Sequence, residues 1–314
     1  MDQKFDRRYK LRVEVAPQSV PASDALLGTQ TATIELPYTC EFTVERMTLA
    51  TNQTATIRII NLRQATRDLL YKDPFWSLEN RFVEFYAGYR DFMPLIFYGK
   101  LVQCVSWREG VNNVTEIQAT SMVFDATNAT IQKTFNPSPQ VTVPYILREL
   151  NRAMPGVNPK PVIGNIGPLD KSGNPIPIPK SISNNGPVWP WIQQISNGRA
   201  VLDNNTMLAL GDNEVVSGGI PLINSASGII GTPKRGQNGV EVSLIFEPRF
   251  TLQQVVQLKS EFNDNLSGTY KVQGFRHSGT ISPRVGGNYQ TDAIFWRPGL
   301  RYDPDVIQPS DPIP

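Results

Sequence analysis

His277 is the only histidine in the chain and is therefore the first residue to consider for catalysis. A single histidine excludes sites built on two histidine ligands, and a catalytic triad would need a serine or cysteine nucleophile in a recognisable setting. The Gly-x-Ser-x-Gly pattern that presents such a serine is absent from the sequence. We therefore interpret His277 as a histidine at a strand end whose ring is hydrogen-bonded to the backbone.

The two cysteines, Cys40 and Cys104, are far apart and form no Cys-x-x-Cys pair. This spacing argues against a zinc site, an iron–sulfur cluster and a disulfide framework. We expect both residues to be buried thiols.

A glycine-rich segment, residues 228–234, contains the residue types of a phosphate-binding loop at the wrong spacing. Pro233 removes a backbone amide that such a loop would need. We interpret the segment as a structural turn.

Paired carboxylates could make a glycosidase, and Glu241 and Glu247 are candidates. With 28 acidic residues in the chain, however, some pairs look suitable by chance. Four tryptophans could line a sugar groove, but we expect the aromatic residue of an amphipathic helix, Trp191, to belong to the core. These tryptophans are Trp107, Trp189, Trp191 and Trp296. We assign no catalytic, cofactor-binding or metal-binding residue and do not expect an enzyme.

The composition narrows the class of protein. The 314 residues carry a formal charge of +2, 18% are charged and 26 are proline. This length suggests two or three domains and excludes a single small module. The low charged fraction and the high proline content favour strands, turns and ordered loops over long helical bundles. The near-neutral net charge removes the electrostatic case for a dedicated nucleic-acid binder. No run of about 20 apolar residues occurs, so we expect a chain that folds in the cytosol without a membrane anchor.

Alternation of apolar and polar residues dominates the first third of the sequence. In residues 55–59 the apolar side chains share one face, while Thr56 and Arg58 share the other. Residues 81–86, 97–107 and 114–119 continue this pattern, and turn residues separate them. We expect an antiparallel meander that closes into a barrel, with one short helix at residues 62–70 beside it.

Residues 97–107 form the longest of these expected strands. Strict alternation places Leu101, Gln103 and Val105 on one side and Val102 and Cys104 on the other. The residues that we expect on polar faces of the sheet are Thr56, Arg58, Glu84 and Gln103.

The sequence changes character after about residue 127. Residues 145–154 predict an amphipathic helix, and a second helix is expected from Pro187 to residues 197–198. Between them, residues 155–185 are rich in proline, glycine and asparagine, which predicts a long ordered loop or an exposed arm. Residues 200–202 and 207–210 predict a hairpin. We interpret this region as a small α+β domain.

Strand patterns return near the C-terminus, in residues 240–246, 254–260, 270–277 and 291–296. Residues 255–258 and 271–273 faintly echo residues 82–85 and 100–102, as a weak internal repeat would. The proline-rich tail after Arg297 is expected to be extended and to suit docking onto a neighbouring protein.

These patterns together predict a mainly β protein with an α+β insert. The expected domains are a first barrel at residues 1–126, an α+β domain at 127–217, a second barrel at 218–297 and an extended tail at 298–314.

Several segments resemble the baseplate hub proteins of contractile-tailed bacteriophages. Residues 54–62, 66–70, 83–89, 96–101 and 115–119 are similar, in order and spacing, to the first barrel of that family. Residues 225–233, 239–248 and 268–279 are similar to its second barrel. Residues 133–135 and the two expected helices match the middle domain more loosely.

The resemblance implies two tail-tube-like barrels in one chain and a ring of three chains, distantly like the hub of type VI secretion spikes. Such a ring presents six similar barrels to a sixfold tube and keeps a threefold face for the spike. It implies a structural protein of the virion baseplate, assembled in the host cytoplasm, that needs no cofactor. Its implied partners are the tail tube or tube-initiator protein, the central spike, the tape-measure protein and baseplate wedge proteins, with DNA passing through the lumen.

Two alternatives stay open at this point. The chain could be another tube or adaptor protein of a tail or secretion machine. It could also be a tail protein that binds or cleaves carbohydrate.

Overall fold

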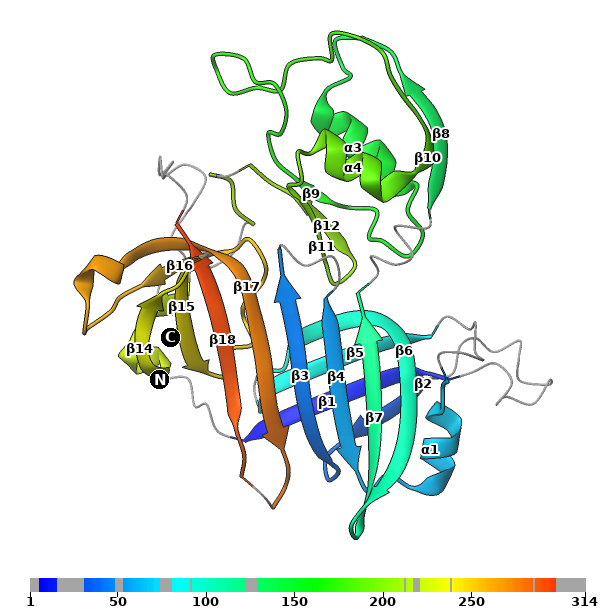
Figure 1. Cartoon of the computed structure of the whole chain (residues 1–314), viewed down its shortest axis with the longest axis vertical. Helices are drawn as coiled ribbons and strands as arrows, with labels where there is room; N and C mark the ends of the chain where they lie inside the picture. The colour runs from blue at the N-terminus through cyan, green and yellow to red at the C-terminus, as the bar shows by residue number, and fades with distance from the viewer. Residues whose placement is uncertain are drawn as a thin grey trace, which may run out of the picture.

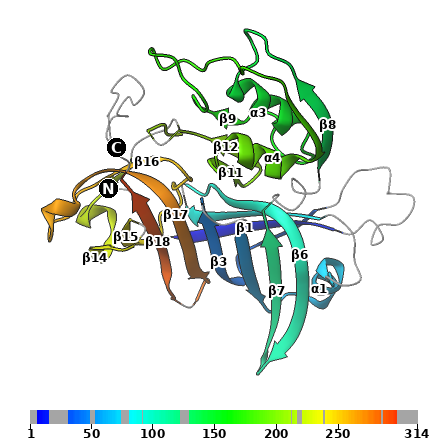
Figure 2. The ribbon, with the colours of Figure 1, turned by 45° about the horizontal axis from the view of Figure 1, so that its top comes forward.

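The computed structural model describes residues 6–15, 31–48, 53–73, 81–90, 92–121, 129–211, 213–216, 221–237, 239–284 and 286–297. The expected C-terminal tail, residues 298–314, lies outside the described residues. Two β regions lie side by side, and a smaller region with two helices covers one end of them (Figure 1). A view turned by 45° shows the same arrangement (Figure 2).

The strands of the first β region are β1 (Arg7–Glu14), β2 (Thr31–Glu35), β3 (Thr39–Met47), β4 (Thr54–Ile60), β5 (Phe82–Tyr89), β6 (Leu95–Glu109) and β7 (Asn112–Thr120), with helix α1 (Gln64–Leu70). The middle region contains β8 (Thr130–Phe135), α3 (Val143–Arg152), β9 (Val162–Ile163), β10 (Ile182–Pro187), α4 (Val188–Ile195), β11 (Ala200–Asp203) and β12 (Thr206–Ala209). The second β region contains β13 (Leu222–Ile223), η3 (Ser225–Ser227), β14 (Ile229–Arg235), β15 (Val240–Ile245), β16 (Val255–Leu258), η4 (Asp264–Leu266), β17 (Gly268–Ile281) and β18 (Tyr289–Trp296).

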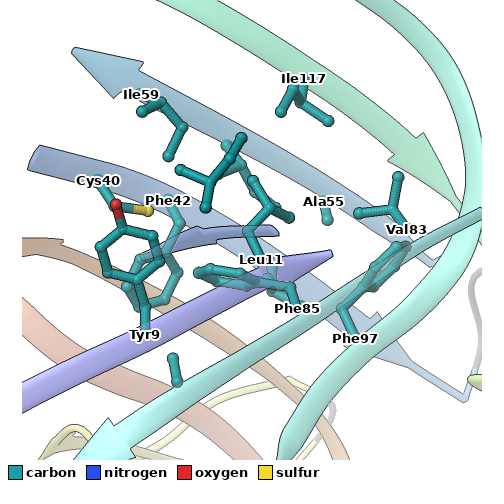
Figure 3. Packing of buried hydrophobic residues seen from close by; sticks show 14 of the residues in the cluster. Tyr9, Leu11, Cys40, Phe42, Ala55, Ile59, Val83, Phe85, Phe97 and Ile117 are labelled. Carbon is teal, nitrogen blue, oxygen red and sulfur yellow. The ribbon is translucent and has the colours of Figure 1, made fainter. Parts of the chain in front are cut away.

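The first β region packs two walls of one sheet against each other. Strands β3, β4 and β7 form one wall, and β1 and β5 cross behind it at a steep angle (Figure 1). On β4 the alternating side chains of Ala55, Ile57 and Ile59 are buried, as the period-two pattern predicts. They meet Leu11 of β1 and Phe85 of β5 in one core (Figure 3). Burying this apolar surface holds the two walls together.

The second β region repeats the strand order of the first. The first runs β3-β4-β7-β6-β5, the second runs β14-β15-β18-β17-β16, and all of these neighbours are antiparallel. The register also slips at matching points, between Leu101 and Gln103 on β6 and between Val272 and Gly274 on β17. The faint echo in the sequence therefore corresponds to repeated topology.

The two β regions are joined into one sheet. The C-terminal part of β17 pairs with β3 from Gly274 opposite Met47 to Ile281 opposite Cys40. Thirteen strands of the described residues share this sheet, whose hydrogen-bonded path ends at β14 and at β2. No strand pair among those residues closes either region on itself. The sheet is therefore a continuous ladder across both regions, where the sequence suggested two separate closed barrels.

An aromatic cluster fills the junction of the two β regions. Phe42 and Tyr89 of the first region contact Phe246 and Tyr289 of the second, with ring centroids 5.6 to 6.3 Å apart. The Tyr89 hydroxyl donates to the Phe246 carbonyl at 2.9 Å, and the Tyr289 hydroxyl donates to the Gly88 carbonyl at 2.9 Å. The two regions thus share a core and satisfy their buried hydroxyl groups across the junction.

The middle region has its own core of residues from α3, α4 and the β11–β12 hairpin. Helix α3 begins where the Thr142 side chain accepts from the Tyr145 amide, and Pro144 occupies its first turn. Both predicted helices and the predicted hairpin are confirmed within about two residues.

The expectation of a loop or exposed arm over residues 155–185 was only partly right. Strand β9 lies within this segment. Strand β10 begins in it and pairs with β8. Val157, Ile166 and Ile178 anchor the rest of the segment in the middle core. These isolated apolar residues have no helical or strand period, which is why the pattern did not reveal them.

The predicted facing of residues 97–107 was wrong beyond Leu101. Leu101 and Cys104 are both buried, whereas Val102 is exposed. The register slip at Val102 adds one residue and shifts the alternation by one position. Sequence periodicity alone does not locate such a bulge.

Residues 228–234 were also interpreted wrongly as a turn. They run into β14, an edge strand that pairs with β15. Its pairing is irregular between Ile230 and Lys234, so the strand has no clear alternation.

Replacing Phe246 with alanine tests the shared core. We expect a loss of about 3–5 kcal/mol in the free energy of unfolding, since a large buried ring leaves a cavity that its neighbours fill poorly. Because the ring packs against residues of both β regions, they are expected to unfold in one transition. Denaturant unfolding followed by fluorescence and circular dichroism measures both.

The matched control is Phe262→Ala, because the Phe262 side chain is 84% exposed. We expect this control to change the stability by less than about 0.5 kcal/mol. Two separate transitions in the wild-type chain, with only one shifted by Phe246→Ala, would contradict a shared core.

Candidate functional site

His277 lies inside β17 rather than at a strand end, and it is fully buried. Its Nδ1 is 2.8 Å from the Thr291 hydroxyl on β18, so a side chain and not the backbone satisfies this ring nitrogen. Thr291 Oγ1 also accepts from the Glu247 amide at 2.9 Å. Burial, with a smaller contribution from Arg46, lowers the pKa of His277 to about 3. This neutral imidazole is a packing residue at the β3–β17 junction.

Both cysteines are buried, as expected. Burial raises the pKa of the Cys104 thiol to about 12 and that of Cys40 well above its usual value. Neither is a thiolate at neutral pH. The described residues contain no group of three His, Cys, Asp or Glu side chains that could hold a metal ion.

The candidate carboxylates and tryptophans do not assemble into one site. Glu241 is exposed on β15, whereas Glu247 is 2% exposed and forms an ion pair with Arg249. Trp189 and Trp191 are buried in α4 of the middle region. Trp107 and Trp296 are partly exposed on different β regions. None of the helices in the described residues has the length and apolar character needed to cross a membrane.

A broad polar surface is the main feature that the fold builds from both β regions. Residues directly opposite in an antiparallel pair share one face of a sheet. Across the β3–β17 junction, Glu41 lies opposite Thr280, Thr43 opposite Ser278 and Glu45 opposite Arg276. The same rows continue onto β4, β7, β18 and β15. We call this surface the polar sheet face; its members are Glu41, Thr43, Glu45, Thr56, Arg58, Gln103, Glu116, Gln118, Glu241, Ser243, Arg276, Ser278, Thr280, Gln290 and Asp292.

The polar sheet face carries acidic and basic groups interspersed along its rows. Five of its members are carboxylates, those of Glu41, Glu45, Glu116, Glu241 and Asp292, and two are guanidinium groups, those of Arg58 and Arg276. Three further charged residues extend the same rows: Lys234 opposite Glu241, Lys100 opposite Thr120 and Glu109 opposite Asn112.

Ion pairs and hydrogen bonds order this face. Arg58 Nε is 2.7 Å from a Glu116 oxygen, and this bond raises the pKa of Arg58. Arg276 Nε is 3.3 Å from Glu45 across the junction of the two β regions. These exposed pairs contribute little stability but fix the orientation of the side chains.

Three of the four predicted polar positions, Thr56, Arg58 and Gln103, lie on the polar sheet face. Glu84 does not. It lies on β5 in the other wall, where Arg12 of β1 donates to it at 2.9 Å. Alternation assigns a side chain to the inside or the outside of a sheet, but it does not say which wall the strand joins.

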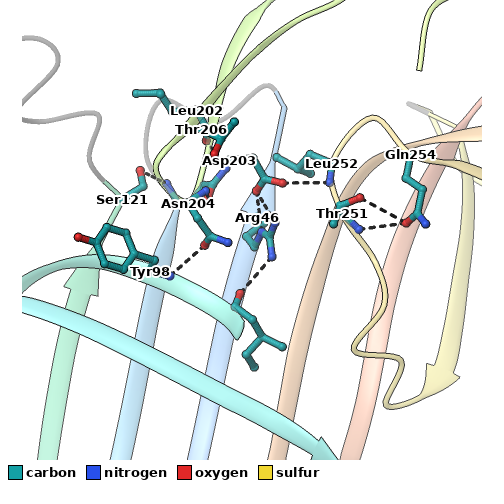
Figure 4. A network of polar contacts seen from close by, with 12 residues as sticks. Arg46, Tyr98, Ser121, Leu202, Asp203, Asn204, Thr206, Thr251, Leu252 and Gln254 are labelled. Carbon is teal, nitrogen blue, oxygen red and sulfur yellow. Dashed lines mark hydrogen bonds and ion pairs between the residues drawn. The ribbon is translucent and has the colours of Figure 1, made fainter. Parts of the chain in front are cut away.

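A buried polar cluster fixes the middle region against both β regions (Figure 4). Asp203, at the end of β11, forms an ion pair with Arg46 of β3, and the two side chains are 8% and 3% exposed. Its second oxygen accepts from the Leu252 amide of the second β region at 3.3 Å. Arg46 also donates to the Ile96 carbonyl of β6 at 3.1 Å. A buried pair satisfied in this way is costly to break from one side, by about 3–5 kcal/mol.

The tip of the same hairpin adds further contacts with the first β region. The Tyr98 amide donates to Asn204 Oδ1 at 2.9 Å, and the Asn204 amide donates to Gln53 Oε1 at 3.3 Å. Asn204 adopts a φ of 54°, which asparagine tolerates better than most residues. Sequence reasoning found the hairpin but not its docking site, because Arg46 and Asp203 are 157 positions apart.

Solved structures show the class of this fold. The tail protein from Neisseria meningitidis MC58 superposes with a TM-score of 0.55 at 11% identity, covering 91% of this chain and 96% of that one. The 43 kDa tail protein of prophage MuSo2 from Shewanella oneidensis gives 0.55 at 10% identity, covering 92% and 97%. The fold is that of phage tail proteins.

A secretion-system protein shares the fold. The E. coli c3393 protein is described as a component of the type VI secretion system with structural similarity to the T4 bacteriophage tail proteins gp27 and gp5. It gives a TM-score of 0.52 at 10% identity, covering 87% of this chain and 78% of that one.

The sequence itself matches the family described as baseplate hub gp41 over residues 26–278. The chain belongs to this family of structural baseplate proteins and is therefore a component of the phage tail in the virion. The predicted resemblance to baseplate hub proteins is confirmed. Comparison with curated protein sequences finds no match.

Acidification tests the buried neutral state of His277. Its folded pKa of about 3 is below its ordinary value of 6.5, so the unfolded chain binds a proton in this range that the folded chain does not. The contribution of His277 to the free energy of unfolding is fully present above pH 6.5. It falls by about 1.4 kcal/mol per pH unit as the pH decreases toward 3. In His277→Gln this contribution is absent, so the advantage of wild type over variant should shrink between pH 7 and pH 5.

Chemical unfolding of both proteins at several pH values measures this difference. The other titrating groups are common to the two chains and cancel in the comparison. Parallel stability profiles over the whole range would show that His277 is protonated as easily in the folded chain as in the unfolded one.

Proposed function

We propose that this chain is the hub ring of the baseplate, a homotrimer that joins the sixfold tail tube to the threefold central spike. The observation that carries the proposal is the repeated strand order in a single chain. Three copies of a chain with two equivalent β units supply six such units around one axis, while the chains themselves keep threefold symmetry. The chain would thus match two symmetries.

In this proposal each β region acts as one tube-like unit of the ring. Residues 1–126 and 218–297 form the two tube-like domains, and residues 127–217 form the α+β domain. The shared strand order and the matching bulges on β6 and β17 support the equivalence of the two tube-like domains.

The polar sheet face would line the channel. Its strands come from both β regions and form one continuous surface, as the wall of a tube requires. The charges on this face are of mixed sign and lie among hydroxyl and amide groups, so phosphates meet no concentrated positive surface, and DNA and the tape-measure protein could pass without binding tightly. The passage of DNA is transient and independent of sequence.

The middle region would contact neighbouring baseplate proteins. It lies over one end of the β regions (Figure 2). Residues 164–181 carry two exposed apolar side chains, Leu169 and Ile176, which are 43% and 41% exposed. We assign this segment to a contact with the spike or a wedge protein, and the tube end of the ring to the tail tube or tube-initiator protein. Assembly would take place in the host cytoplasm.

The alternatives have less support. A carbohydrate-binding or carbohydrate-cleaving protein needs aromatic or acidic residues gathered in one groove. In the described part of this chain the four candidate tryptophans do not share a groove: Trp189 and Trp191 are buried in α4, and Trp107 and Trp296 lie on different β regions. Another tube or adaptor protein would share the fold but would not need two β units in one chain.

The mass of the assembled hub tests the trimer. Native mass spectrometry of the full chain, and of hub particles released from virions, should give three times the mass of one chain. A stable monomer in the virion, or a hexamer, would contradict the proposed symmetry match.

A further inference from the structure

The internal repeat can be aligned residue by residue. The bulged residues, Val102 of β6 and Gln273 of β17, are equivalent in this alignment. Ser106 is then the equivalent of His277. An independent contact supports this alignment: Ser106 is hydrogen-bonded to Thr115 at 2.9 Å, and His277 is hydrogen-bonded to Thr291 at 2.8 Å. Thr115 and Thr291 lie at matching positions of β7 and β18 and are both fully buried.

The equivalent halves of β6 and β17 differ in what covers them. The end of β17 pairs with β3 along its whole length after the bulge, and His277 and Ile281 are fully buried. The corresponding end of β6 pairs with β7 on one side. On its other side Lys72 exchanges two backbone hydrogen bonds with Cys104, and no strand of the described residues pairs beyond that point. Residues 106–109 are exposed.

The second region contains a strand that corresponds to β3 and lacks the corresponding partner. β14 pairs with β15 as β3 pairs with β4, but it ends the hydrogen-bonded path of the described strands. Its Ile230 is 47% exposed. Each chain therefore has two such edges among its described strands. One is β14, which corresponds to β3, and the other is the C-terminal half of β6, which corresponds to the C-terminal half of β17.

We propose that β14 of one copy pairs with the C-terminal half of β6 in the next copy, reproducing between chains the β3–β17 ladder within a chain. This inference rests on the proposed ring and identifies the surfaces that close it. The contact is head-to-tail, so it would build a closed ring of three copies, with six ladders alternating within and between chains. It would also cover Trp107, which is 36% exposed at this end of β6.

The intrachain register predicts the register between chains. Thr43 lies opposite Ser278, and Glu41 lies opposite Thr280. The equivalent pairs are Lys234 with Trp107 and Ile230 with Glu109. Pairing Lys234 with Trp107 would place an ammonium group beside an indole ring, which is a favourable contact.

The irregular part of β14 limits how the strand can pair. Pro233 has no amide to donate, and Gly231 has a φ of 76°. Features of this kind protect an edge strand from indiscriminate pairing. They leave two short stretches, around Ile230 and around Lys234, that a partner of matching register can use.

Disulfide cross-linking tests the inference. Two variants of the full chain, Lys234→Cys with Trp107→Cys and Ile230→Cys with Glu109→Cys, are oxidised mildly and separated on non-reducing gels. We expect covalent dimers and closed trimers as the main products of both variants. The native cysteines are buried and should not interfere.

The structure offers matched controls. Thr43→Cys with Ser278→Cys sits at the equivalent positions within one chain and should form a disulfide in the monomer band. Ile230→Cys with Val105→Cys is displaced by four residues, about 13 Å along a strand, and should not cross-link.

The outcomes separate this inference from the proposed trimer. A native mass of three chains, with the intrachain control oxidised but neither matched pair linked between chains, would overturn the pairing and leave the trimer intact. Equal cross-linking of the displaced pair would overturn the register. A monomer by native mass would overturn the ring and the pairing together.

Discussion

The ladder between β3 and β17 is the constraint on which the rest of the structure depends. Its eight residue pairs, from Gly274 with Met47 to Ile281 with Cys40, join two similar β regions into one sheet. Backbone hydrogen bonds fix both the distance and the twist between strands. The angle between the two regions is therefore set by sheet geometry and not by a flexible linker.

The two faces of this ladder carry different kinds of side chain. On the inner side, the aromatic residues Phe42, Phe246 and Tyr289 fill a core common to the two regions, and His277 is buried as a neutral ring. On the outer side, the polar rows of the two regions become one surface. The Arg46–Asp203 ion pair adds the middle region to the same junction, because Arg46 belongs to β3 and Asp203 to the hairpin of the middle region.

Local patterns predicted much of the fold, since the periodicity of residues 55–59 and of the helix after Thr142 is visible in the sequence. The bulge at Val102 was not predicted, because one extra residue in a strand does not change the local composition. The β3–β17 ladder escaped because its strands are over 200 residues apart, and pairing at that separation depends on shape rather than on local propensity. For the polar surface, alternation identified Thr56, Arg58 and Gln103, whereas the placement of Glu84 required the crossing of the two walls.

A map of the tail tip from electron cryo-microscopy tests the central claim most directly. We expect a ring at the base of the tube in which six similar β units surround the channel, each chain supplying two of them, with the polar sheet face toward the lumen. A ring in which each chain supplies one unit, or in which the polar sheet face points away from the channel, would contradict it.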